Sequence, residues 1–188
     1  MADEFTVTIP GEGTRRLACL YSVLRDLQWV KSACVLALRH MTQSEPDTVV
    51  TQALQVAALV RYCRCFEADA QMPFPLTSQI LECLPADLKT AHDELLELRF
   101  KYIAQSASDL EDNVPTAHLT QDETTGAYQV SKLRVEQRDR HLLSQEAMKA
   151  LFALARICRD MARAESEREK TRLLTYVAQA MGVQRVSE

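Results

Sequence analysis

Hydrophobic residues recur at steps of three and four along most of this chain, a spacing that places them on one face of an α-helix. Over residues 14–42 the spacing predicts a long first helix with an apolar face of Leu17, Leu20, Tyr21, Leu24, Leu27, Cys34, Val35 and Leu38. A second helix is expected from Pro46 and Asp47 to about residue 69, because proline is well tolerated in the first helical turn. Its density of apolar residues predicts a place in the core.

Two more helices are predicted in the second half of the chain. The third covers about residues 86–107, with an apolar stripe of Leu88, Ala91, Leu95, Leu98 and Tyr102. The helical period returns from about residue 136 and predicts a long helix, from about residue 138 to near Gly182. One face of this helix would carry Leu143, Ala147, Ala150, Leu154, Ile157 and Met161.

Short strands are indicated where apolar and polar residues alternate. Phe5, Val7 and Ile9 predict an N-terminal strand over residues 5–10. Residues 114–135 alternate around a polar turn containing Gly126, which predicts a β-hairpin between the third helix and the long one. The expected fold is therefore mainly α: a helical bundle in one domain, residues 1–188, with a small β-hairpin insertion.

The composition agrees with a helical globular protein. Of 188 residues 47% are hydrophobic and 26% are charged, and there are few glycines and prolines. The formal net charge of −4 means that binding to nucleic acid would need a local cluster of Arg and Lys. No run approaches the ~20 apolar residues of a membrane span, so we expect a cytoplasmic protein without a membrane partner.

The six cysteines lie in apolar, helical surroundings and lack the spacing of a disulfide framework. Cys63 and Cys65 are two residues apart on a predicted helix and would point about 200° away from each other. We therefore expect buried thiols and no metal site. No glycine-rich phosphate loop is present, and we expect no cofactor.

The stretch HDELLELRFKYIAQS, residues 92–106, follows a long helix pair and the segment VRYCRCFEA. Together they resemble the HEPN superfamily of helical proteins, whose members include ribonucleases of toxin–antitoxin and phage-defence systems. Many relatives read Arg-Asn-Lys-Tyr-Ile-Ala-His-Ser. Here Arg99 and the segment from Lys101 to Ala104 fit, whereas Phe100 stands in place of Asn and Gln105 in place of His.

The resemblance implies how an active relative would work. Two protomers face each other in a homodimer and cleave RNA without metal, the 2′-hydroxyl attacking the adjacent phosphate. That reaction needs a group that exchanges a proton near neutral pH, which His supplies and Gln cannot. The resemblance therefore implies a degenerate site and a homodimer that binds RNA or a protein partner, in a defence or toxin–antitoxin setting.

The candidate binding residues at this site are Arg99, Lys101, Gln105, Ser106 and Glu111. The planar fork of the Arg99 guanidinium matches phosphate oxygens. An ion pair with a glutamate is the structural alternative, and the candidate partners are Glu94, Glu97 and Glu111.

Two further alternatives stay open. His92 lies two helical turns before Arg99, about 10 Å away on the same face, so the two could form an unconventional metal-independent ribonuclease site. His92 could instead pack between helices. The other alternative is a helical protein-interaction scaffold. A cluster of Arg99 with Lys101, Arg61 or Arg64 would favour nucleic acid, and an apolar surface there would favour a protein partner.

Overall fold

The computed structural model describes residues 11–45, 47–68, 75–76, 81–104, 111–121, 126–139 and 143–181. Its helices are α1 (Glu12–Met41), α2 (Thr48–Arg64), α4 (Ala86–Ala104) and α5 (Gln145–Met181), and its strands are β1 (Glu111–Gln121) and β2 (Tyr128–Asp139). The expected helical bundle with a two-stranded hairpin is confirmed. The strand predicted over residues 5–10 lies outside the described residues.

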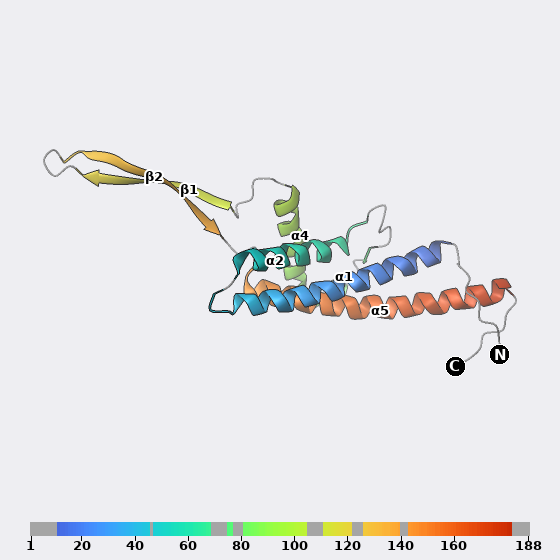
Figure 1. Cartoon of the computed structure of the whole chain (residues 1–188). Coiled ribbons are helices and arrows are strands. Elements are labelled where there is room, and N and C mark those ends of the chain that lie inside the picture. Colours follow the sequence, from blue (N-terminus) through green and yellow to red (C-terminus); the bar gives the residue numbers. More distant parts are fainter. Residues whose placement is uncertain are drawn as a thin grey trace, which may run out of the picture.

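The core forms between the two longest helices, α1 and α5, which lie side by side, with α2 packed along α1 (Figure 1). The apolar stripes of the sequence face inward. From α1 come Leu27, Val30 and Cys34, and from α5 come Leu151, Leu154 and Cys158, all of them fully buried. Burial of these stripes is the main favourable contribution to folding.

The starts of α2 and α5 are fixed by short polar side chains. Asp47 caps α2, because its carboxylate accepts a hydrogen bond from the Val50 amide at 3.0 Å. The Ser144 hydroxyl accepts from the Ala147 amide at 3.1 Å and starts α5 in the same way. The boundary predicted near residue 136 or 138 is therefore wrong.

The hairpin is longer than predicted and explains this error. Its antiparallel register runs from the pair Glu111 and Asp139 to the pair Gln121 and Tyr128, so residues 136–139 belong to β2. Their amide and carbonyl groups pair across the strands, and this pairing outweighs the local helical preference of a charged segment. Gly126, with φ +68°, supplies the left-handed backbone conformation next to the turn.

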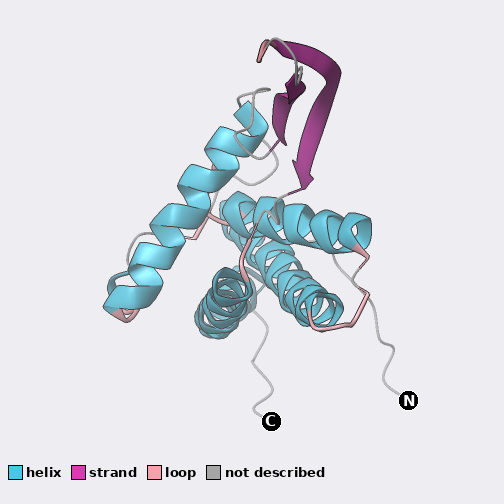
Figure 2. Cartoon of the chain, turned by 90° about the vertical axis from the view of Figure 1, so that its left-hand side faces the viewer, coloured by secondary structure: helices cyan, strands magenta, loops and turns pink. Residues whose placement is uncertain are grey.

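The hairpin projects away from the helices (Figures 1 and 2). The other side of the bundle is completed by α4, which packs against α2 and α5. Gln55 connects α2 to the residues just before α5. Its side-chain amide donates a hydrogen bond to the Leu143 carbonyl at 2.9 Å and accepts one from the Leu143 amide at 3.3 Å. The start of α5 is thereby fixed next to α2 and α4.

None of the helices, within the described residues, contains an apolar stretch long enough to cross a membrane. The six cysteines form no disulfide; Cys83 is exposed and the other five are buried. Burial raises the pKa of the Cys34, Cys63 and Cys158 thiols to about 12, so these thiols stay protonated at neutral pH.

Candidate functional site

The residues of the candidate motif lie on and after α4. Arg99, Phe100 and Lys101 are in its last two turns, and Phe100 is exposed. Gln105 and Ser106 lie outside the described residues, and for Glu111 the structure describes the backbone at the start of β1.

Arg99 forms an ion pair with Glu67, just beyond the end of α2. Of the two alternatives left open for Arg99, the structure shows the ion pair with a glutamate, but with a partner other than the candidates Glu94, Glu97 and Glu111. Glu97 instead pairs with Lys101 at 2.6 Å, one turn along α4. The Glu67 partner could not be found from sequence, because residues 32 positions apart meet here through helix packing.

His92 is buried between α4 and α2. Its Nδ1 atom shares a hydrogen bond of 2.8 Å with the Tyr62 hydroxyl. The imidazole ring also meets the ring of Phe66 edge-on, with 4.6 Å between the ring centroids. Burial lowers the pKa of His92, and the nearby Asp93 carboxylate opposes this only in part. His92 is thus a neutral packing residue with its hydrogen bond satisfied.

Arg61 and Arg64 bind the carboxylate of Asp26 on α1. The Arg61 Nη1 donates to Oδ1 at 2.9 Å, and the Arg64 Nε donates to Oδ2 at 3.1 Å. Asp26 is fully buried, so the two guanidiniums stabilise a charge that would otherwise be costly. Arg61 also lies over the Trp29 ring, 4.6 Å from its centroid. Both arginines are therefore engaged with α1, whereas Arg99 is engaged with Glu67.

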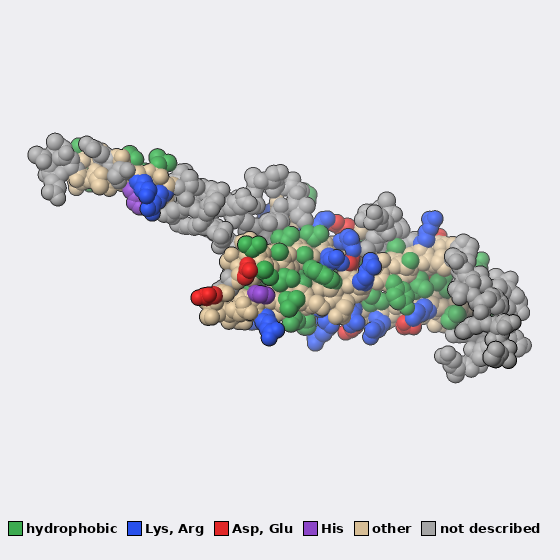
Figure 3. All heavy atoms as spheres, in the orientation of Figure 1, with side chains coloured by type: hydrophobic (Ala, Val, Ile, Leu, Met, Phe, Trp, Pro, Cys, Tyr) green, Lys and Arg blue, Asp and Glu red, His purple; other side chains and the backbone are tan. Residues whose placement is uncertain are grey.

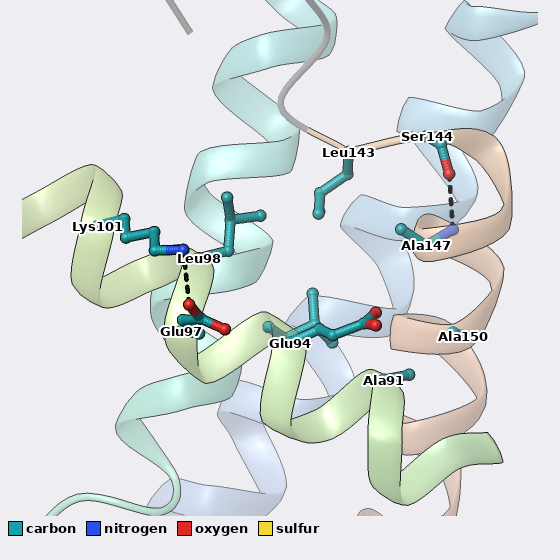
Figure 4. A pocket seen from close by; sticks show the side chains of 10 residues that line it. Ala91, Glu94, Glu97, Leu98, Lys101, Leu143, Ser144, Ala147 and Ala150 are labelled. Carbon is teal, nitrogen blue, oxygen red and sulfur yellow. Dashed lines mark hydrogen bonds and ion pairs between the residues drawn. The ribbon is translucent and has the colours of Figure 1, made fainter. Parts of the chain in front are cut away.

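The other side of α4 forms a groove with α5, which Figure 4 shows from close by. Its cavity volume is about 350 Å³, within the usual range for binding pockets. The lining residues are Ala91, Glu94, Leu95, Glu97, Leu98, Lys101, Leu143, Ser144, Ala147 and Ala150. The small alanine side chains on both helices leave the groove unfilled. The Leu143 side chain lines the groove because the hydrogen bonds of Gln55 hold the Leu143 backbone in place.

Acidic side chains stand on the rim of this apolar groove. The hydrogen bond from Lys101 lowers the pKa of Glu97, so that carboxylate stays ionised. Glu94 has no ion-pair partner among the described residues, and its carboxylate points toward α5 (Figure 4). The groove thus combines an apolar floor with a negative charge at its edge.

Sequence reasoning missed this groove and the role of Gln55. The signal was present as Ala147 and Ala150 on the face that faces α4, but alanines are also ordinary core residues. For metal binding the described residues offer no group of three or more His, Cys, Asp or Glu side chains in suitable positions.

Comparison with protein-family models, with curated proteins and with solved structures found no match to this chain. The resemblance to the HEPN superfamily therefore stays a prediction from residues 92–106 and their setting.

Proposed function

We propose that this chain is a HEPN-like protein that acts by binding a protein partner, without cleaving RNA, in a phage-defence or toxin–antitoxin setting. The observation that carries the proposal is the acidic rim of the apolar groove between α4 and α5. This groove lies on the helix that also carries the candidate motif.

The candidate catalytic side chains favour this choice over catalysis. His92 is buried, neutral and hydrogen-bonded to Tyr62, so it is poorly placed to accept a proton from a substrate. Arg99 forms an ion pair with Glu67, and this neighbouring negative charge weakens the attraction of its guanidinium for a phosphate. Gln105 has no proton to exchange near neutral pH.

The charge of the groove favours a protein ligand over RNA. Its floor offers Leu95, Leu98 and Leu143 to an apolar side chain. The Glu94 carboxylate at the rim would attract a neighbouring Lys or Arg of that ligand and would repel the phosphates of RNA. The ligand that fits is a peptide segment with a large apolar residue next to a basic one.

Fluorescence anisotropy with two labelled peptide libraries tests this proposal. Both libraries carry a central Leu or Phe, flanked by Lys in one and by Glu in the other. We expect binding by the Lys library alone. Ala147→Phe, which fills the groove, and Glu94→Lys should each weaken binding by roughly tenfold, equivalent to about 1.4 kcal/mol.

Asp93→Lys is the matched control, because it makes the same charge change on an exposed residue of α4 that does not line this groove. If Asp93→Lys weakens peptide binding as much as Glu94→Lys does, the net charge of the protein, and not the groove, determines binding. Equal binding of the two libraries would contradict the proposal.

RNA binding is a second candidate, favoured by the stacking of Arg61 on the partly exposed Trp29. An aromatic ring beside arginines is a platform on which bases can stack. Trp29 is the one tryptophan in the sequence, so its fluorescence reports directly on this position. Quenching by single-stranded RNA that Arg61→Ala abolishes would support this second function.

A further inference from the structure

One face of the β1–β2 hairpin is apolar. Residues directly opposite each other on two strands share a face of the sheet. Leu119 pairs with Val130, Ala117 with Leu133, and Gln121 with Tyr128. These six residues therefore lie on one face, and five of them are apolar.

A β-bulge produces this arrangement. Side chains alternate strictly along a regular strand, so Val130 and Leu133, three residues apart, would point to opposite faces. The register shifts opposite His118 and Leu119, where Ser131 is the extra residue of β2. Because of this extra residue, the Leu133 side chain lies on the same face as Val130. Lys132 and Arg134 consequently lie on the other face, opposite His118 and Thr116.

The apolar face is open to solvent. The exposed fractions are 57% for Leu119, 67% for Tyr128, 62% for Val130 and 69% for Leu133. Figure 3 shows apolar side chains along one side of the hairpin and Lys, Arg and His along the other. An isolated two-stranded hairpin is marginally stable in water, and an additional packed layer is what usually stabilises it.

We propose that this face is a self-association surface, on which the hairpins of two copies of the chain pack together. The inference goes beyond the proposed function, because it concerns the hairpin, which contributes no residue to the lining of the α4–α5 groove. None of the six residues that form this apolar face is charged, so the face is complementary to a second copy of itself. The cationic faces, with Lys132 and Arg134, would then point outward on opposite sides of the pair.

The area is sufficient for such a pair. Tyr128 alone would bury roughly 150–250 Å², so each apolar face would bury on the order of 500 Å² and two would reach roughly 1,000 Å², the lower limit for a specific interface. Packed sheets lie about 10 Å apart, and an 11-residue strand such as β1 spans roughly 35 Å. Two hairpins packed in antiparallel directions would keep the helical parts at opposite ends, in a twofold-symmetric, isologous dimer.

Light scattering of the full chain across micromolar concentrations is the first test. We expect twice the 21.2 kDa of one chain. Leu119→Ser with Val130→Ser should give the mass of one chain with unchanged helical circular dichroism. His118→Ser with Lys132→Ser changes the neighbouring cross-strand pair on the opposite face and should stay dimeric.

A thiol-protection experiment provides the second test and does not depend on a disruptive variant. In a Cys83→Ser background, Val130→Cys should react slowly with a maleimide in concentrated protein and at least several-fold faster on dilution. Lys132→Cys, on the other face, should react quickly at both concentrations.

A monomeric mass at all concentrations would overturn the proposal, as would a dimer that persists in the Leu119→Ser, Val130→Ser variant. Equal reaction rates of Val130→Cys at both concentrations would also overturn it. Loss of peptide binding in the α4–α5 groove has no bearing on these outcomes, so the two proposals fail separately.

Discussion

His92 and Arg99 have partners on the second helix and the turn after it, and this explains why their sequence context alone is ambiguous. A histidine two turns before an arginine on one helix predicts a shared face, and both side chains do contact residues of α2 or of the turn after it. The hydrogen bond to Tyr62 and the ion pair with Glu67 depend on how α2 packs against α4. Such partners are contributed by tertiary structure and are not encoded in any local spacing.

The buried His92 predicts a pH dependence of stability. Its ordinary pKa is 6.5 and burial lowers it in the folded chain, so below pH 6.5 the unfolded chain binds a proton that the folded chain does not. Stability should therefore fall as the pH decreases from 6.5 toward the lowered pKa.

His92→Asn keeps a hydrogen-bonding group for the Tyr62 hydroxyl but removes the titration, so the stability of this variant should change less over this pH range. Urea unfolding at a series of pH values measures the difference. Identical pH profiles for the two proteins would contradict the prediction.

Removing the two arginines that bind Asp26 and removing the Asp26 carboxylate itself should lower the stability of the fold by unequal amounts. Arg61→Ala with Arg64→Ala leaves a fully buried carboxylate without these two donors, which typically costs about 3–5 kcal/mol. Asp26→Asn leaves two arginines that are partly exposed and can turn toward water, so its cost should be smaller. Denaturant unfolding measures both, and a larger loss in Asp26→Asn would refute the asymmetry.

The resemblance of residues 99–106 to the HEPN motif gives a prediction about activity. A general acid or base typically contributes 10²–10⁴-fold to a rate, and Gln105 cannot supply it. We expect no metal-independent cleavage of a fluorescent RNA by the native protein. Gln105→His with Phe100→Asn would rebuild the motif and should restore cleavage in the presence of a chelator.

His92→Ala separates the alternatives in the same assay. Robust cleavage by the native protein that His92→Ala abolishes would favour an unconventional ribonuclease over the binding function. If the rebuilt protein does not cleave RNA, that result would argue against the positional match of residues 99–106 to the superfamily motif.

At the scale of the elements, apolar periodicity predicted the helices well. The start of α2 lies within about two residues of the expected position, because Pro46 and Asp47 give a clear local signal. The start of α5 was placed too early, because the helical period of the sequence extends back into the charged residues 136–139. Their pairing with β1 decides the outcome.

The α4–α5 groove could not be predicted from the sequence either, because it exists only where two helices meet at small residues.

Gln55 fixes the junction between α2 and the start of α5, through two hydrogen bonds to Leu143. Gln55→Met would leave a buried amide and carbonyl without a partner, a loss of about 1–3 kcal/mol. Gln52→Met, on the same helix, is the control and should be nearly neutral. Urea unfolding distinguishes the two variants.

At the scale of the whole molecule, the hairpin and the helices form separate parts. The buried apolar core is made of residues from the helices and their connections, with none from β1 or β2 among the described residues. A chain whose residues 112–138 are replaced by a short Gly-Ser linker should therefore keep its helical circular dichroism and a similar thermal midpoint.

The replacement is feasible because Glu111 and Asp139 are paired across the hairpin base and lie about 5 Å apart. Loss of the cooperative transition in the shortened chain would show that the helices depend on the hairpin. If the hairpins mediate self-association, the same chain should also be monomeric in light scattering.

A two-stranded sheet has an unpaired edge along each strand, so the described part of the hairpin offers two rows of backbone amide and carbonyl groups to other chains. Such edges can template the addition of further strands, which leads to ordered aggregation at high concentration. The bulge at Ser131 and the cations Lys132 and Arg134 are features that interrupt this growth. Solubility at high concentration therefore depends on a few residues of β2, and replacing Lys132 and Arg134 by threonine should make the protein more prone to aggregate while the helical fold stays intact.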